Sequence, residues 1–306
     1  MSENVKGYIW GALAAIFYGM NPLFALPMLH AGMDAQSVLF LRYVIAIPIL
    51  ATIMTIRGRG FGLRREQWIP LILMGLLMAA SSLTLYLSYA YIGAAIASTL
   101  LFIYPILVTV IMSACYHEHV SLLTVTCILL ACSGIALLYR GDNGAALSPT
   151  GLLLIFISAL TYAVYLVGVS RPALKVIPTL KMTLYVIIFG TFVYATRLAA
   201  GSFAPLGQHP LLWLDAVGMA LFPTAISLLC TSAAIQRIGS TPVAILGALE
   251  PVTAVAFAVL IFNERLTVRL ALGMMLVIAA VTLIIAGGRL NTILLRVRKI
   301  FPRIHR

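Results

Sequence analysis

Long apolar segments follow one another along the whole sequence, and many approach 20 residues, as in VAILGALEPVTAVAFAVLIF from Val243 to Phe262. A helix of about 20 residues crosses the roughly 30 Å hydrocarbon core of a bilayer. The composition agrees, because 62% of the residues are hydrophobic and only 9% are charged, whereas soluble domains carry about 25% charged residues. The chain is therefore expected to cross a membrane several times.

Charged and turn-forming residues divide the sequence into ten apolar segments. Backbone groups inside lipid must be hydrogen-bonded within their own segment, so runs of this length form helices, and the alternating pattern of barrel strands is absent. The first segment is too long for the apolar region of a signal peptide and is interpreted as a retained span. The expected fold is an all-α polytopic membrane protein with ten transmembrane helices, near residues 7–27, 36–56, 69–91, 94–114, 120–139, 150–170, 179–200, 211–235, 242–262 and 266–287.

Lysine and arginine are distributed unequally between the two sides of these spans. With the N-terminus inside, fifteen fall on the inner side and four on the outer side, while Arg42 lies within the second span. The positive-inside rule then places both termini in the cytoplasm. The net charge of +12 is thereby explained without a nucleic-acid partner. The basic tail, residues 289–306, either forms a short helix on anionic lipid or is a frayed, solvated end; both interpretations stay open.

The sequence contains an internal repeat. IGAAIASTLLFIYPILVTVIMSACYHEHVS, from Ile92, aligns without gaps to IGSTPVAILGALEPVTAVAFAVLIFNERLT, from Ile238, at an offset of 146. Tyr18 in the first span likewise matches Tyr162 in the sixth at an offset of 144. Proline, glycine and glutamate recur at matching places, the clearest pairs being Gly93 with Gly239, Pro105 with Pro251, and Glu118 with Glu264.

The repeat predicts the domain organisation. Residues 1–145 and 146–288 would each form one five-helix half, followed by the tail of residues 289–306. Because five is odd, the second half enters the membrane in the opposite direction to the first. Inverted repeats of this kind are common in secondary transporters, whose substrate site lies near the midplane between the halves.

The LEP…ERL motif, at Leu249-Glu250-Pro251 and Glu264-Arg265-Leu266, and the apolar helices around it resemble the EamA-type family of the drug/metabolite transporter superfamily. In the first half the motif reads IYP…HEHV, so Tyr104 replaces the glutamate and His119 replaces the arginine. The resemblance implies two inverted five-helix repeats around a central cavity, alternating access, a bacterial inner membrane, and export or exchange of small metabolites such as amino acids. It does not identify the cargo.

Glu250 is the carboxylate nearest the middle of a span. A charged side chain there costs about 2.5–3.5 kcal/mol on insertion scales, unless it faces a cavity or takes up a proton. Removal from water favours the protonated form of a carboxyl group. Two interpretations follow: Glu250 binds a proton or the ammonium group of the cargo, or a protonated Glu250 only hydrogen-bonds a neighbouring helix beside Pro251.

The prolines that match between the two halves, Pro105 and Pro251, each remove an intrahelical hydrogen bond. The carbonyls of Leu101 and Gly247 are thereby freed, and they either line a polar cavity or simply allow a bend. A paired hinge at mid-membrane is the functional interpretation.

Other polar side chains within spans are candidates for cargo binding. Arg42 either extends toward the outer interface or binds a substrate carboxylate in a bidentate pair. Asn21, beside Pro22, either caps a broken helix or contacts cargo. Tyrosine hydroxyls need partners in lipid, and Tyr104, which occupies the place of Glu250, is the best candidate for the opposite wall of a cavity. The remaining aromatic candidates, for which packing is the alternative, are Tyr18, Tyr86 and Tyr162.

Other functional classes lack sequence support. No HExxH, nucleophile elbow or P-loop is present, so neither an enzyme nor a cofactor is expected, although a membrane-embedded enzyme is kept as a distant alternative. A passive channel or facilitator is the nearer alternative, although no carbonyl-loop filter is recognisable. The four cysteines suggest no disulfide framework, and CYHEHVS lacks the spacing of a metal site. The expected partners are a small-molecule substrate, lipid and, for coupling, protons.

Overall fold

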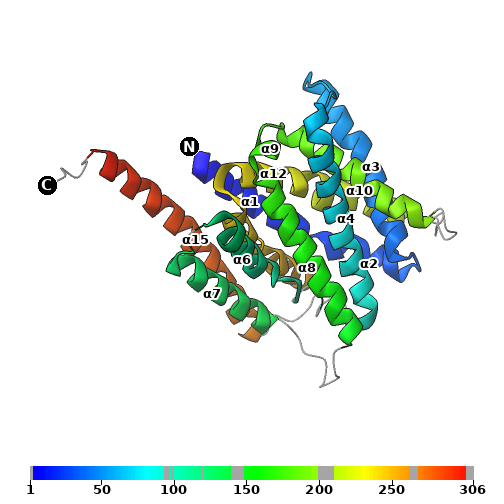
Figure 1. The fold of residues 1–306 in the computed structure, drawn as a ribbon. Helices are drawn as coiled ribbons and strands as arrows, with labels where there is room; N and C mark the ends of the chain where they lie inside the picture. The colour runs from blue at the N-terminus through cyan, green and yellow to red at the C-terminus, as the bar shows by residue number, and fades with distance from the viewer. Residues whose placement is uncertain are drawn as a thin grey trace.

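The computed structural model describes residues 3–92, 97, 100–118, 120–138, 148–198, 210–261 and 268–300, and every regular element in this part of the chain is a helix (Figure 1). The helices are α1 (Glu3–Gly19), α2 (Asn21–His30), α3 (Ala35–Ile56), α4 (Arg65–Ile92), α6 (Tyr104–Tyr116), α7 (Leu122–Leu138), α8 (Pro149–Val169), α9 (Pro172–Lys175), α10 (Thr179–Leu198), α11 (Pro210–Met219), η1 (Ala220–Ile226), α12 (Ser227–Ile238), α13 (Ser240–Leu246), α14 (Leu249–Ile261) and α15 (Val268–Ile300).

Within the described residues, six helical stretches are long and apolar enough to cross a membrane. Three shorter apolar helices, Tyr104–Tyr116, Leu122–Leu137 and Ala271–Ala286, fall where the fourth, fifth and tenth spans are expected. The all-α membrane fold is therefore confirmed, while the count of ten spans stays a prediction. The six long stretches are Glu3–His30, Ala35–Ile56, Arg65–Ile92, Pro149–Val169, Thr179–Thr196 and Pro210–Ile238.

Several of the expected spans are interrupted near their middle. The first divides at Met20 into α1 and α2, with Pro22 in the first turn of α2, where the missing N–H of proline is tolerated. The ninth divides at Gly247 and Ala248 into α13 and α14. In the fourth, a turn at Phe102 and Ile103 precedes α6. These last two turns lie within one residue of each other under the offset of 146, so the repeat extends to the helix breaks.

The eighth span contains a π-helical turn, η1, between α11 and α12. Pro223 lies inside it, and because proline has no N–H, it cannot continue the regular hydrogen-bond ladder. The Thr224 hydroxyl donates to the Met219 carbonyl at 2.8 Å and stabilises the widened turn. π-helical turns frequently mark functional positions in helices, and this one faces the second span, as described below.

Hydrogen bonds between the halves follow the internal repeat. The Ser81 hydroxyl of α4 donates to the Ser158 carbonyl of α8 at 3.0 Å. The Ser227 hydroxyl of α12 donates to the Ala14 carbonyl of α1, also at 3.0 Å. Ser81 and Ser227 are equivalent at offset 146, and Ala14 and Ser158 at offset 144. The packing of α1 against α12 therefore repeats the packing of α8 against α4.

Close helix contacts repeat in the same way. A Cβ atom on Gly7 would lie 2.6 Å from Cγ2 of Ile238, and one on Gly151 would lie 2.5 Å from Cγ2 of Ile92. Small residues let membrane helices approach closely, which explains glycine at both matching positions. In Figure 1, α1 begins at the upper end of the bundle and α8 at the lower end, so the two helices run in opposite senses.

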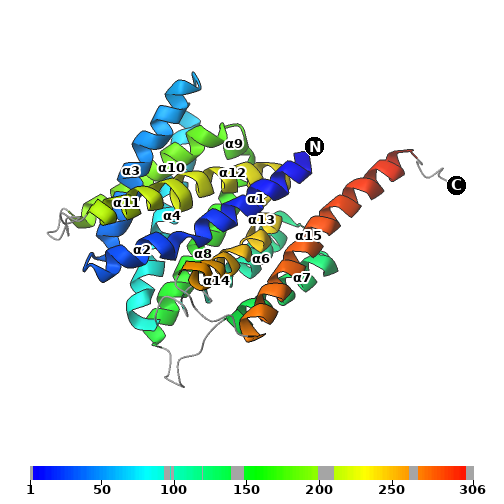
Figure 2. The same cartoon turned by 180° about the vertical axis from the view of Figure 1, so that it is seen from behind.

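Helices α7 and α15 pack together at one side of the bundle (Figure 2). Gly134 lies so close to Gly273 that a Cβ atom would be 2.8 Å from its carbonyl oxygen. Helix α15 continues without interruption to Ile300. Residues 289–300 are therefore helical and continuous with α15, which contradicts a frayed end for them, while their contact with anionic lipid stays a prediction.

Candidate transport site

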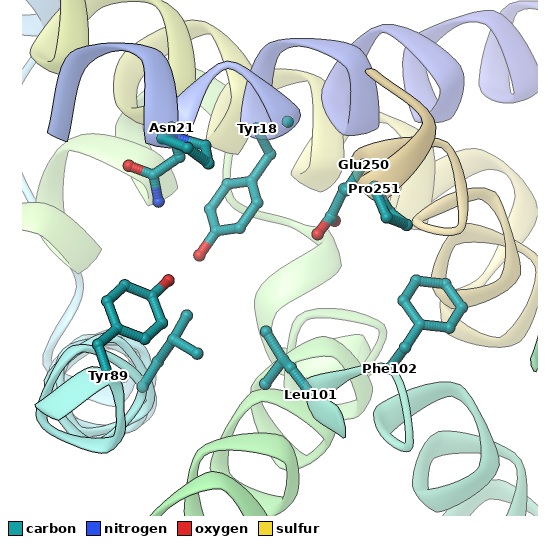
Figure 3. A pocket seen from close by; sticks show the side chains of 10 residues that line it. Tyr18, Asn21, Tyr89, Leu101, Phe102, Glu250 and Pro251 are labelled. Carbon is teal, nitrogen blue, oxygen red and sulfur yellow. The ribbon is translucent and has the colours of Figure 1, made fainter. Parts of the chain in front are cut away.

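Glu250 lies in the first turn of α14, directly after the break at Gly247 and Ala248. Its backbone N–H donates to the Gly247 carbonyl at 2.8 Å, so the carbonyl that Pro251 leaves free of its usual partner is used locally. The Glu250 carboxyl points into a cavity of about 60 Å³ (Figure 3). The Tyr18 and Tyr89 hydroxyls point into the same space. The lining residues are Tyr18, Gly19, Asn21, Pro22, Leu85, Tyr89, Leu101, Phe102, Glu250 and Pro251.

A second, smaller cavity of about 10 Å³ lies on the other side of Glu250 and shares this residue with the first. Among the described residues, Glu250 is the group common to the linings of both cavities. Glu250 therefore borders both spaces. The second lining consists of Gly11, Ala14, Ala15, Tyr104, Tyr162, Leu166, Thr231, Val243, Gly247 and Glu250.

Tyr104 and Tyr162 form the wall opposite Glu250. Their rings meet edge to face with centroids 4.9 Å apart. The Tyr104 hydroxyl packs against Gly247, where a Cβ atom would overlap it, and its side chain interacts with the Glu250 carboxyl. Tyr104 and Tyr162 are both buried. The structure thus brings together four predicted site residues, the fourth being Tyr18, which also interacts with Glu250.

Arg42 is buried, with 1% of its surface exposed, and does not reach the outer interface. Its Nε donates to the Thr224 hydroxyl at 2.5 Å and its Nη2 donates to the Pro223 carbonyl at 3.2 Å. The guanidinium therefore holds α3 against the π-helical turn η1. Its Nη1 atom is buried and has no hydrogen-bond partner among the described residues.

Tyr18 interacts with both Arg42 and Glu250. Cζ of Arg42 is 5.8 Å from the centroid of this ring, a distance at which a cation is attracted to an aromatic face. Arg42 lines neither of the two cavities. The two charged candidates are thus linked through Tyr18 and share neither of these two cavities.

Asn21 and Tyr86 form a buried pair at the break in the first span. The Tyr86 hydroxyl donates to Oδ1 of Asn21 at 2.9 Å, and the Tyr86 ring stacks on Tyr89 with centroids 5.2 Å apart. Asn21 does not cap α2, because the N-cap position is Met20 and no side chain makes a capping hydrogen bond there. Asn21 lines the larger cavity, whereas Tyr86 supports it from behind.

The two matched prolines lie at matched helix starts. Pro105 is in the first turn of α6 and Pro251 is in the first turn of α14. Pro251 lines the larger cavity together with Leu101 and Phe102 of the other half. Both prolines are thus placed where helix breaks border the site, and their action as hinges stays a prediction.

Among the lining residues with polar or aromatic side chains, the sequence analysis did not select three as site residues: Tyr89, Phe102 and Thr231. Thr231 could have been found, because Ser227 and Thr231 are four residues apart and so share one face of an apolar helix. Tyr89 stands out only as a tyrosine inside a span. Phe102 carries no polar signal, since its importance comes from the break in the chain beside it.

Comparison with known proteins decides the family. The sequence profile of the EamA-like transporter family matches residues 5–140 and again residues 149–286. The chain belongs to this family. It is therefore an integral membrane protein and a transporter of the drug/metabolite transporter superfamily, as the LEP…ERL motif suggested. Two parts of the repeated motif, His119 and residues 264–266, lie outside the described part of the chain.

A solved structure supports the fold independently. The crystal structure of a protein with 16% sequence identity superposes with a TM-score of 0.80 over 91% of this chain and 96% of its own. At this identity the likeness establishes the arrangement of helices and nothing about cargo. No protein of curated function matches the sequence.

Proposed function

We propose that this protein is a secondary transporter that moves small metabolites, amino acids or related compounds, by alternating access between its two halves. It works as an exporter or exchanger in a bacterial inner membrane, with both termini in the cytoplasm. The observation that carries this proposal is the position of Glu250, which borders both cavities beside a helix break and points its carboxyl into the larger one.

The size of the cavity bears on how cargo would bind. About 60 Å³ holds a few water molecules at most, whereas ligand pockets are typically about 300–1,000 Å³. Cargo binding therefore requires the walls to separate. The breaks at Met20, at Phe102 and Ile103, and at Gly247 and Ala248 supply places where helices can bend, and Pro105 and Pro251 are the proposed hinges.

The chemistry of the lining suits a cargo with a positive end and an apolar body. No lysine or arginine among the described residues interacts with the Glu250 carboxyl, so the carboxyl is available for a proton or an ammonium group. The rings of Tyr18, Tyr104 and Tyr162 surround it, and aromatic faces attract cations. Asn21 adds an amide to the same space.

The experiment is counterflow in proteoliposomes loaded with an unlabelled amino-acid panel and given each labelled compound outside. A carrier gives saturable uptake that depends on the internal compound. Flux that rises linearly with concentration and ignores the internal compound would identify a passive channel and overturn the proposal. Tyr104→Phe tests whether the cavity takes part, and it should change the half-saturation concentration. The control is Tyr91→Phe, because Tyr91 is exposed and lines neither cavity.

A further inference from the structure

A third, separate cavity lies between α1, α3, α10 and α12, and its volume is about 370 Å³. Its floor is mainly aliphatic, and its mouth carries three arginines. We call it the arginine groove. It is lined by Trp10, Ile53, Arg57, Arg59, Thr179, Leu180, Ile226, Leu229, Cys230, Ala233 and Arg237.

Two of the arginines are held by a regular helix-ending motif. After α3 the Gly58 N–H donates to the Thr55 carbonyl at 2.9 Å, and the Arg59 N–H donates to the Met54 carbonyl at 3.0 Å. This is the bonding pattern of a Schellman motif, and Gly58 has the positive φ of 61° that the motif needs. Arg57 and Arg59 thus leave the helix end in a fixed backbone geometry, and both side chains are exposed.

The rest of the mouth is held by contacts between helix ends. The Lys181 ammonium of α10 donates to the Gly62 carbonyl of the loop after α3 at 2.8 Å. Arg237, at the end of α12, donates to the Ala233 carbonyl at 2.8 Å and to Glu3 at 3.2 Å. Among the described ion pairs, those of Glu3 bring a carboxylate to the edge of the groove. Three arginines line the groove, so positive charge dominates its mouth.

The groove is separated from the transport site by α12. Leu229, Ala233 and Arg237 follow one another four residues apart and face the groove. Thr231 lies on the opposite side of the same helix, about 200° away at 100° per residue, and lines the smaller cavity with Glu250. The arginine groove is therefore peripheral and not a continuation of the transport path.

We propose that the arginine groove binds an anionic phospholipid. The phosphate group lies between Arg57, Arg59 and Arg237, since guanidinium groups pair with phosphate oxygens in charge-assisted hydrogen bonds. One acyl chain lies along the aliphatic floor, against Leu180 and Leu229. The mouth is at the helix ends, where the polar surface of the bilayer is, and basic groups there attract anionic lipid.

Trp10 supports this assignment of the occupant. Its side chain is 39% exposed at the rim of the groove, and tryptophan is enriched where membrane helices meet the headgroup region. A soluble anion would need only the arginines. The aliphatic floor below them and the tryptophan beside them fit a ligand with both a phosphate and a hydrocarbon chain.

The test is native mass spectrometry of the purified protein with phosphatidylglycerol or phosphatidylcholine added in steps. Wild type is expected to bind phosphatidylglycerol about tenfold more tightly than phosphatidylcholine. Arg57→Gln with Arg59→Gln should abolish this preference, and Arg57→Lys with Arg59→Lys should retain part of it. The matched control is Arg64→Gln with Arg65→Gln, which removes two arginines from the same loop and α4 start but outside the groove, and it should behave as wild type.

A second variant examines the acyl chain. Ala233→Phe fills the floor of the groove without changing its charge. It should weaken the binding of phosphatidylglycerol and of phosphatidylcholine to the same extent. Equal phosphatidylglycerol binding by the groove variant and the Arg64 and Arg65 control would overturn the proposal. The proposal would also fail if glycerol 3-phosphate displaced phosphatidylglycerol at the same concentration as the lipid and Ala233→Phe left lipid binding unchanged. The groove would then bind a soluble anion. None of these readouts measures transport, so their failure leaves the proposed transport function untouched.

Discussion

The Tyr104 side chain packs against Gly247 and interacts with the Glu250 carboxyl, although Tyr104 and Glu250 occupy equivalent positions in the two halves. Residues near a two-fold axis meet their own equivalents across it. The contact therefore places these two residues close to the pseudo-symmetry axis of the repeat. Because one half contributes a carboxyl and the other a phenol, Glu250 is the one carboxyl that lines the two cavities among the described residues.

Gly247→Ala should destabilise the protein, since the added Cβ would overlap the Tyr104 hydroxyl. Overpacking of this kind typically costs about 1–3 kcal/mol. The measurement is the thermal unfolding midpoint in detergent, with Gly60→Ala as the control because nothing lies within 4 Å of a Cβ there. Adding Tyr104→Phe should restore part of the loss. Equal midpoints for Gly247→Ala and Gly60→Ala would mean that the Tyr104–Gly247 contact is not as described.

Arg42→Met should lower stability more than its loss of charge suggests, because the Pro223 carbonyl then loses its guanidinium donor and Thr224 loses a partner. A buried polar group left without a partner costs about 1–3 kcal/mol. Arg42→Lys should recover only part of this, since an ammonium cannot reproduce the planar guanidinium contacts.

The control for Arg42 is Arg269→Met, because Arg269 is exposed on α15. Thermal unfolding compares the three variants. If Arg42→Met unfolds at the same temperature as Arg269→Met, Arg42 does not brace the π-helical turn.

Ser81→Ala and Ser227→Ala should have similar effects, because each removes one hydroxyl-to-carbonyl bond between the halves at equivalent positions. Hydrogen bonds between membrane helices are worth about 0.6 kcal/mol on average, so each midpoint should shift by a small, comparable amount. Chemical unfolding in mixed micelles gives the free energies. The reference is Ser133→Ala, because the exposed Ser133 hydroxyl donates only to the Leu129 carbonyl of its own helix. A large loss in one variant and none in the other would show that the two contacts are not equivalent.

Much of the architecture could be predicted because it depends on local composition. Apolar runs predict helices, and the gapless repeat predicts which positions correspond, including Pro105 with Pro251. The partner of Arg42 could not be predicted, since Thr224 lies 182 residues away and a π-helical turn around Pro223 leaves no distinct sequence pattern. The expected tail boundary at residue 289 rested on a change from apolar to basic residues, and helix α15 continues across it.

The site was partly predictable for the same reason. Glu250 and Tyr104 stand out because a polar group in a lipid-spanning run needs an explanation. Their mutual contact depends on how the halves pack, which the repeat alone does not specify. Phe102 and Tyr89 enter the lining through helix breaks and helix rotation, which are properties of the tertiary structure.

The measurement that most directly tests the central claim compares Glu250→Gln with wild type in proteoliposomes, for exchange without a pH gradient and for accumulation with one. The account predicts that the variant loses gradient-driven accumulation while keeping exchange if the carboxyl carries the coupling proton, or loses both if it binds the cargo. Glu66→Gln, at an exposed glutamate at the start of α4, should match wild type. If Glu250→Gln also matches wild type in both assays, Glu250 is only a contact between helices, and the account is wrong.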